Sequence, residues 1–286
     1  GNREMQLALL SAAAGIAVSA AVTGWLTVHG FPLARAACPH SAPSCRPLAF
    51  IHIPKTGGTA IRHVGAASGM LWGKFAFQPK RMNMRQRLAF KLTRIFHQLP
   101  LVWLKGEFML KMPDGGFCPP HHVPPYHFPA SLRSAEAFCV VRDPAERLVS
   151  EWKMELARQK VVSSTDKQSR EIVRKAGCTA SGLSRWTEMV LSRFRDGETS
   201  IRRCHLWPQI DYVRDPDTDT RTCHHVLRTS QLTEDFNNLM QERGYPFVME
   251  AKADSESYWV RKSTSAVCNV SVADLSESAW KLIKSI

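Results

Sequence analysis

The chain lacks several signatures that would otherwise suggest a function. No G-x-x-x-x-G-K-[ST] stretch occurs, which disfavours an NTPase with a Walker A loop. None of the eight cysteines lies in a C-x-x-C pair, so the spacing typical of structural zinc sites is missing. The chain also has no internal repeat and no long low-complexity segment. Repeat architectures, disordered tails and zinc modules are therefore poor descriptions of it.

Acidic residues are scarce relative to basic ones. The 25 Asp and Glu residues face 38 Lys and Arg residues, which gives a formal net charge of +13. Such an excess attracts anionic partners, and at this point nucleic acid, an acidic glycan and an anionic membrane are all open. The 286 residues are 44% hydrophobic and 22% charged, enough for one sizeable globular domain or two small ones.

A long uncharged apolar run lies near the N-terminus. The run from Met5 to Val28 is longer than the roughly 20 residues that cross a hydrocarbon core. A signal-peptide core would be about 7–15 residues, so the length predicts an uncleaved signal anchor, although Ala34-Arg35-Ala36 offers a cleavage site. Either outcome delivers the rest of the chain to a lumen. We therefore predict an anchor over residues 1–30, a Pro-, Ala- and Ser-rich stem over 31–47, and one domain over 48–286.

The cysteines are even in number, which suits disulfide bonds in an oxidising compartment. Cys204 and Cys223 bracket one loop-like insert, and we expect them to pair. Cys139 lies inside an apolar strand pattern, where a buried free thiol is the alternative. Asn269-Val270-Ser271 is an N-glycosylation acceptor sequence if the domain is lumenal.

The first candidate site follows the apolar run Leu48–Ile53, which is typical of a buried strand. Pro54-Lys55-Thr56-Gly57-Gly58-Thr59 comes next, and a helix is predicted from Ala60. The glycines let backbone N–H groups approach an anion, Lys55 adds a charge, the threonines add hydroxyls, and the helix adds its dipole. These features predict a phosphate cradle. The alternative is an ordinary strand-to-helix turn with a solvated lysine.

The second candidate site follows another predicted strand, Phe138–Val141. Arg142 stands at its exit, Pro144 suits the first turn of a helix, and Ser150 lies two helical turns further on. An arginine and a hydroxyl in this arrangement can converge on one phosphate. The alternative is a helix start with structural ion pairs. In either case the inward stripe of the helix should consist of Leu148, Trp152 and Leu156.

Between these two sites lies a histidine-bearing loop, Cys118–His127. Its prolines exclude a long helix or a central strand, so the three histidines stand on a semi-rigid loop. Imidazole titrates in the range that suits a general base. His122 is the candidate base, with His121 and His127 as weaker alternates. Surface or structural histidines are the other interpretation.

The motifs carry a family resemblance. Pro-Lys-Thr-Gly-Gly-Thr after a strand resembles the 5′-phosphosulfate-binding loop of sulfotransferases that use 3′-phosphoadenosine 5′-phosphosulfate (PAPS) as donor. Its form is most similar to the Golgi carbohydrate sulfotransferases, especially the heparan sulfate O-sulfotransferase branch. Arg-Asp-Pro-x-x-Arg-x-x-Ser, from Arg142 to Ser150, resembles the 3′-phosphate-binding motif of the same enzymes. The resemblance spans roughly Leu48 to Ala279.

The resemblance implies roles for individual residues. His122 lies where these enzymes place the base that removes the proton of the acceptor hydroxyl. Lys55 would offset the charge that develops on the bridging oxygen of the donor. The remaining implied donor-binding residues are Thr56, Gly57, Gly58, Thr59, Arg142 and Ser150.

The resemblance also implies a P-loop-like sulfotransferase fold, an α/β architecture with a central parallel sheet flanked by helices. Both loops would then lie at the carboxyl ends of parallel strands, where such sheets bind ligands. The expected reaction is transfer of a sulfuryl group from PAPS, with no metal, to a hydroxyl of an acidic or neutral glycan. Nucleic acid is not expected as a partner. The expected location is the Golgi membrane, as a single-pass type II protein with a lumenal catalytic domain.

Two other function classes fit the sequence less well. A nucleotide-dependent kinase fails on the missing Walker A loop and magnesium ligands. A heparin-binding or lectin-like protein without catalysis would explain the charge and the cysteines, but it would not explain two ordered phosphate motifs.

Other segments are less specific. Residues 80–99 have the spacing of a basic amphipathic helix, whose cationic face is either solvated or grips an acidic polymer or a membrane. His205-Leu206-Trp207-Pro208-Gln209 resembles a His-x-x-Pro-Gln segment of related Golgi-type enzymes, with core packing as the favoured interpretation. Further predicted elements are a helix over 183–194, a strand over 224–227, a helix capped by Thr233, and a helix from about Asp274.

Overall fold

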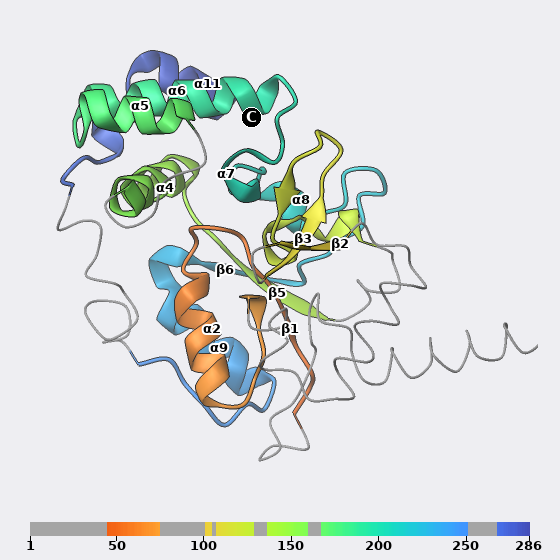
Figure 1. Ribbon diagram of the computed structural model, residues 1–286. Helices are drawn as coiled ribbons and strands as arrows, with labels where there is room; N and C mark the ends of the chain where they lie inside the picture. The colour runs from red at the N-terminus through yellow and green to blue at the C-terminus, as the bar shows by residue number, and fades with distance from the viewer. Residues whose placement is uncertain (1–44, 75–100, 105–106, 129–135, 160–166, 251–267) are drawn as a thin grey trace, which may run out of the picture.

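The computed structural model describes residues 45–74, 101–104, 107–128, 136–159, 167–250 and 268–286 (Figure 1). The predicted anchor, nearly all of the predicted stem, and the predicted basic helix at 80–99 lie outside these residues. Within the described ranges, no helix combines the length and the apolar character needed to cross a membrane.

A three-stranded parallel sheet forms the centre of the fold. Its strands are β1 (Ala49–Ile51), β5 (Ala137–Val141) and β6 (His225–Arg228), in the order β1-β5-β6. Phe50 lies opposite Phe138, and Cys139 lies opposite Val226. Because all three strands run the same way, their carboxyl ends meet at one edge of the sheet. The predicted α/β class with a central parallel sheet is confirmed.

The two faces of this sheet bury alternate residues, as the period of a strand requires. Phe50, Phe138 and Val140 face α2 (Gly58–Ala67) and α9 (Leu232–Glu242), which lie side by side below the sheet in Figure 1. Burying each of these aromatic or aliphatic side chains stabilises the fold by about 1.5–3 kcal/mol. This layer holds the helix that follows the first candidate loop against the sheet.

The opposite face packs against a small antiparallel sheet that the sequence did not predict. Its strands are β2 (Leu101–Leu104), β3 (Glu107–Lys111) and β4 (Phe117–Cys118), in that order. Residues at its end, such as Leu110 and Cys118, share a buried cluster with Ile51 and Cys139 of the central sheet. The predicted proline-rich loop follows β4 as two short 3-10 turns, η3 (Pro120–His122) and η4 (Pro125–His127).

A third layer consists of helices beyond the carboxyl edge of the sheet. The long helix α4 (Pro144–Gln159) begins at the predicted proline, and its predicted inward stripe of Leu148, Trp152 and Leu156 is buried. Trp152 lies against Trp186, with the two ring centroids 5.6 Å apart. The remaining members of the layer and its connections are α5 (Lys167–Ala176), α6 (Ala180–Arg195), α7 (Ile201–Cys204), α8 (Ile210–Val213), η6 (Thr229–Gln231), η8 (Val272–Asp274) and α11 (Glu277–Lys284).

Several element boundaries differ from the predictions. Helix α2 begins at Gly58 rather than Ala60, because Gly57 adopts a left-handed N-cap conformation. Helix α9 begins at Leu232, with Gln231 rather than Thr233 as its N-cap. The predicted C-terminal helix divides into η8, capped by Ser271, and α11.

The structure corrects the predicted cysteine pairing. Cys204 bonds to Cys118 and Cys223 bonds to Cys139, so the predicted Cys204–Cys223 bridge is wrong and Cys139 is not a free thiol. The reason is topological: Cys223 lies just before β6, the neighbour of the strand that carries Cys139. A third bridge joins Cys178 to Cys268. The general expectation of disulfide bonds is confirmed.

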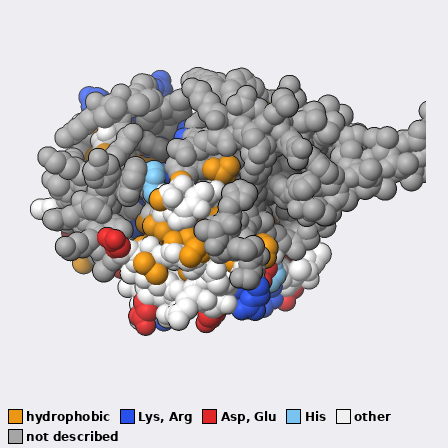
Figure 2. All heavy atoms as spheres, turned by 90° about the horizontal axis from the view of Figure 1, so that it is seen from below, with side chains coloured by type: hydrophobic (Ala, Val, Ile, Leu, Met, Phe, Trp, Pro, Cys, Tyr) orange, Lys and Arg blue, Asp and Glu red, His pale blue; other side chains and the backbone are white. Residues whose placement is uncertain are grey.

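Figure 2 shows the end of the molecule that is lowest in Figure 1. Hydrophobic side chains gather at the centre of this face, with acidic and basic side chains at its margin. Among the described residues, Val248 is the most exposed large hydrophobic one, at 65%. This face lies at the opposite end of the fold from the α4 layer.

Candidate active site

The Pro54–Thr59 loop joins the carboxyl end of β1 to α2. Lys55 and Gly57 have φ values of 70° and 90°, so the chain turns sharply through left-handed conformations. The Ala60 N–H donates to the Gly57 carbonyl at 2.9 Å, whereas the N–H groups of Gly58 and Thr59 precede the helical hydrogen-bond pattern and receive no side-chain cap from Gly57. These donors and the helix dipole suit an anion. Thr59 is exposed beside them, whereas Thr56 is fully buried.

The buried Thr56 hydroxyl donates to the Ile53 carbonyl at 2.9 Å. Thr56 therefore holds the loop in shape, which differs from the role that the sequence implied. The two glycines are required sterically. A Cβ at Gly58 would lie 2.1 Å from His52 Nδ1, and one at Gly57 would lie 2.7 Å from a Leu232 methyl group.

The second candidate loop lies at the neighbouring strand end, after β5. The Gln209 side chain accepts from the Arg142 backbone N–H at 2.9 Å and donates to the Arg142 carbonyl at 2.7 Å. The Arg142 guanidinium is 27% exposed and pairs with Glu146 at 3.1 Å. Arg142 and Ser150 make no direct hydrogen bond to each other, and the predicted convergence of the two on one phosphate stays a prediction.

Helix α4 presents one face to the first loop. Arg147 donates to the carbonyls of Pro54, His205 and Trp207, at 2.9, 2.6 and 2.9 Å respectively. Lys55 Nζ lies 3.5 Å from the Met154 sulfur, two turns further along the helix. Ser150 lies between Arg147 and Met154, at the i+3 and i−4 spacings that share a helix face. Arg147 is therefore structural, while Ser150 faces the side of α4 that carries Lys55.

Thr229, just after β6, joins all three strand ends. Its hydroxyl lies 2.9 Å from the Val141 carbonyl and 3.2 Å from the Thr56 carbonyl. It thereby holds the loop after β1 against the end of β5 at the carboxyl edge of the sheet.

His122 lies in a cluster of four imidazole rings. Its ring centroid is 4.1 Å from that of His121, 4.4 Å from that of His205 and 5.6 Å from that of His52. His122 Nδ1 lies 3.2 Å from the Arg203 carbonyl. Because a carbonyl only accepts, Nδ1 carries the proton and Nε2 of neutral His122 keeps its lone pair. The predicted base thus has the tautomer that leaves Nε2 able to accept a proton.

The other two loop histidines separate. His121 belongs to the cluster, whereas His127 packs against Trp207, with ring centroids 4.9 Å apart. The hydroxyl of Tyr212 donates to the His122 carbonyl at 2.5 Å, and the Cys118–Cys204 disulfide ties the start of the loop to α7. The loop is therefore held from both sides.

Burial keeps three histidines of the cluster, His52, His121 and His122, neutral. Burial first, and then the neighbouring His121 and His205, hold the pKa of His122 well below its usual value. Burial and the positive charge of Arg62 lower the pKa of His52 to about 3. His122 therefore remains in its proton-accepting form through neutral and mildly acidic pH.

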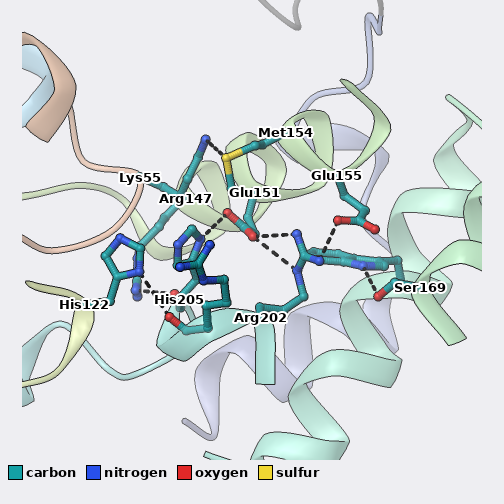
Figure 3. A network of polar contacts seen from close by, with 11 residues as sticks. Lys55, His122, Arg147, Glu151, Met154, Glu155, Ser169, Arg202 and His205 are labelled. Carbon is teal, nitrogen blue, oxygen red and sulfur yellow. Dashed lines mark hydrogen bonds and ion pairs between the residues drawn. The ribbon is translucent and has the colours of Figure 1, made fainter. Parts of the chain in front are cut away.

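A buried ionic network stands behind this cluster (Figure 3). His205 Nδ1 lies 2.8 Å from one oxygen of Glu151, whose other oxygen pairs with Arg202 at 2.9 Å. Arg202 also pairs with Glu155 on the next turn of α4. All of these side chains are at most 5% exposed.

The cluster is bordered by cations. Burial and the neighbouring His52 lower the pKa of His121, and the charges of Lys74, Arg62 and Arg203 lower it further.

In the part of the chain that the structure describes, no group of three or more His, Cys, Asp and Glu residues is arranged to hold a metal ion.

Sequence reasoning missed several residues of this site. His205 and Gln209 belong to the His-x-x-Pro-Gln segment, for which core packing was favoured; His205 is indeed buried, yet its ring faces His122. His52, inside the apolar run before the first loop, was not singled out. Glu151 and Thr229 carry no local signal, because their partners are distant in the sequence.

A model of the sulfotransferase family matches residues 112–284, which is more than half of the chain. The matched range contains His122, Arg142 and Ser150, and it begins after the Pro54–Thr59 loop. No curated protein and no solved structure matches the chain. The family match agrees with the α/β fold and with the two loops, suited to anions, at one edge of its parallel sheet. The chain therefore belongs to the sulfotransferase family.

Proposed function

We propose that this sulfotransferase transfers a sulfuryl group from PAPS to a hydroxyl group of a glycan. The proposal rests on the position of the two loops. The Pro54–Thr59 loop and the Arg142 loop leave adjacent parallel strands at the same edge, beside a cluster of three half-buried histidines and the buried His205. A donor with a 5′-phosphosulfate and a separate 3′-phosphate needs two anion sites. The two loops meet that requirement.

The residues of both loops fit such a donor. The α2 N-terminus and Lys55 would hold the phosphosulfate, with Gly57, Gly58 and Thr59 allowing close approach, while Thr56 keeps the loop in shape. Arg142, and Ser150 on the loop-facing side of α4, would hold the 3′-phosphate. PAPS, when bound, supplies the sulfuryl group and a nucleotide leaving group.

His122 acts as the general base in this proposal. Its Nε2 takes the proton of the acceptor hydroxyl while that oxygen forms a bond to sulfur. The bond between sulfur and the 5′-phosphate oxygen breaks, and adenosine 3′,5′-bisphosphate leaves with the bonding electron pair. Lys55 offsets the negative charge on the departing oxygen.

The cations near His121 support an acidic acceptor over a neutral one. Arg62, Lys74 and Arg203 come from three separate parts of the chain and all act on this side of the cluster. A glycan with carboxylate or sulfate groups would bring its hydroxyl to His122 with favourable electrostatics. This acceptor belongs to the class that the heparan sulfate branch modifies, and a screen of glycans with radiolabelled donor tests it.

Arg142→Ala should weaken binding of adenosine 3′,5′-bisphosphate by about 10–100-fold, because charge-assisted hydrogen bonds to a phosphate contribute about 1.5–3 kcal/mol. Lys55→Ala should weaken it less, since the backbone N–H groups at the α2 N-terminus would still hold the 5′-phosphate. Calorimetric titration measures both. Arg195→Ala removes an exposed arginine from α6 and is the control. Unchanged affinity in both site variants, with folding intact, would remove the donor assignment.

We further propose that the chain is an anchored type II protein of the Golgi membrane, with a lumenal catalytic domain. Asn269, exposed between buried Cys268 and Val270, should then be glycosylated in a eukaryotic secretory host. A glycosidase-sensitive mobility shift, lost in Asn269→Gln, is the expected result. Thiol titration of denatured, unreduced protein should find the cysteines largely oxidised. Eight reactive thiols in that protein would contradict the lumenal location.

A further inference from the structure

The ionic network behind His122 has a feature that sulfuryl transfer by His122 and Lys55 leaves unexplained. Glu151 is a buried carboxylate on α4 that contacts an imidazole instead of solvent (Figure 3). Burial alone would raise the pKa of Glu151, yet His205 and Arg202 hold it well below its ordinary value. Because a carboxylate only accepts, His205 Nδ1 must carry a proton. Glu151 therefore fixes the tautomer and the orientation of the His205 ring.

Arg202 lies between two buried carboxylates in this network. Glu151 and Glu155 both pair with its guanidinium. Of the two carboxylates, Glu151 is the one that contacts a histidine: its oxygen lies 2.8 Å from His205 Nδ1. Charges interact strongly in a buried region, so the Glu151 carboxylate favours positive charge on the side where His205 lies.

His122 is the place where such a charge would arise. Its ring meets that of His205 edge to face, with centroids 4.4 Å apart and planes at 79°. When Nε2 of His122 accepts the hydroxyl proton, the ring becomes a cation one imidazole away from Glu151. The Glu151 carboxylate then stabilises the imidazolium that forms during transfer.

The same network secures the backbone that orients the base. Arg202, Arg203 and Cys204 have φ values of 56°, 58° and 65°, a run of left-handed conformations that non-glycine residues adopt at a cost. The Arg202 ion pairs and the Cys118–Cys204 disulfide hold this turn. Its Arg203 carbonyl accepts from His122 Nδ1.

We propose that Glu151 and His205 are positioning residues that support His122 as a base, with Glu151 supplying the negative charge and His205 the contact through which it acts. This inference rests on the proposed role of His122. The charged and titratable groups that face the His122–His205–Glu151 chain from all neighbouring elements are His52, Lys55, Arg62, Lys74, His121, Arg147, Glu155, Arg202 and Arg203.

Glu151→Gln tests the electrostatic part, with Glu155→Gln as the matched control. Both changes remove one carboxylate from Arg202, but only the first removes the partner of His205. Without the negative charge, protonation of His122 becomes less favourable. Glu151→Gln should therefore lower kcat by about tenfold and move the acidic limb of the rate profile to lower pH by about one unit. Glu155→Gln should lower kcat less and leave the limb in place.

A conservative variant and a measurement without substitution complete the test. Glu151→Asp keeps the charge and should return the acidic limb to its original position. In the unmodified chain, NMR of isotope-labelled imidazole nitrogens should find His205 protonated at Nδ1, even if Glu151→Gln does not fold. A deprotonated Nδ1, or equal losses in the two glutamine variants without movement of the limb, would overturn the inference.

The outcomes separate this inference from the proposed function. If the unmodified chain transfers no sulfuryl group, or if His122→Ala retains full kcat, the proposed function fails. If His122→Ala loses turnover while Glu151→Gln behaves like Glu155→Gln, the inference about Glu151 and His205 fails and the function stands.

Discussion

Replacing His122 with alanine should lower kcat by about 10²–10⁴-fold, the usual contribution of a general base. Binding of adenosine 3′,5′-bisphosphate should stay nearly unchanged, because the imidazole meets the acceptor hydroxyl and not the nucleotide. The backbone contact from Tyr212 to the His122 carbonyl does not depend on the side chain, so the loop should keep its place. Steady-state kinetics with radiolabelled donor measures kcat, and titration measures nucleotide affinity.

The protonation state of His122 determines how activity should depend on pH. His122 is active when neutral, and burial holds its pKa well below the ordinary histidine value. Activity should therefore persist as pH falls through 6.5, and it should be lost only as pH falls through the lowered pKa. His122→Ala should remove this acidic limb.

His127→Ala is the matched control for His122→Ala, because it removes an imidazole from the same loop. His127 packs against Trp207, away from the ring cluster, and its loss should cost less activity. His121→Ala should also cost less, although His121 belongs to the cluster. If His122→Ala keeps its original kcat under conditions where chemistry limits the rate, His122 is not the base, and His121 becomes the next residue to test.

Lys55→Ala should lower kcat by about 10²–10³-fold, the range seen when a donor that stabilises developing negative charge is removed. Lys55 adopts φ 70°, and its ammonium lies against Met154 of α4. The backbone cradle of Gly57 and the α2 N-terminus would remain, so nucleotide binding should fall much less than turnover. Single-turnover kinetics with saturating donor isolates the chemical step.

Lys281→Ala is a suitable control for Lys55→Ala, because it removes one positive charge from an exposed site on α11. Its kcat should match that of the unmodified chain. A Lys55→Ala variant with unchanged single-turnover rates would show that the lysine does not act on the departing oxygen.

The parts of the fold with local signals could be predicted from the sequence. The apolar runs before Pro54 and Arg142 indicated buried strands, and the structure pairs them as the parallel neighbours β1 and β5. Pro144 marked the first turn of α4, and the spacing of Leu148 and Trp152 marked its buried face. Strand length, turn residues and helical period are short-range properties, which explains this success.

The features that the predictions missed depend on contacts between distant residues. Cys204 and Cys223 bracket one insert in the sequence, but each bonds to a cysteine more than 80 residues earlier, because sheet order and the left-handed α7 turn decide which thiols meet. The antiparallel sheet β2–β4 also gave no recognised signal.

The candidate site shows the same division. Lys55, Gly57, Gly58 and Arg142 were predicted from motif and order, and the structure places their two loops at one edge of the parallel sheet. His122 was predicted from its place in chain order, and its ring lies against that of His205. The partners that hold these residues were not found. Gln209 binds the Arg142 backbone from 67 residues away, and Glu151 meets His205 from 54 residues away. No window of sequence contains such pairs.

Transfer of label from sulfur-labelled PAPS to a glycan by the purified chain is the most direct measurement of the central claim. The account predicts label on a glycan hydroxyl, with one adenosine 3′,5′-bisphosphate released for each group transferred. It also predicts that acidic glycans accept more than neutral ones. A folded chain that binds acidic glycans but releases no nucleotide and transfers no label to any glycan would contradict the account, and it would favour a glycan-binding protein without catalysis.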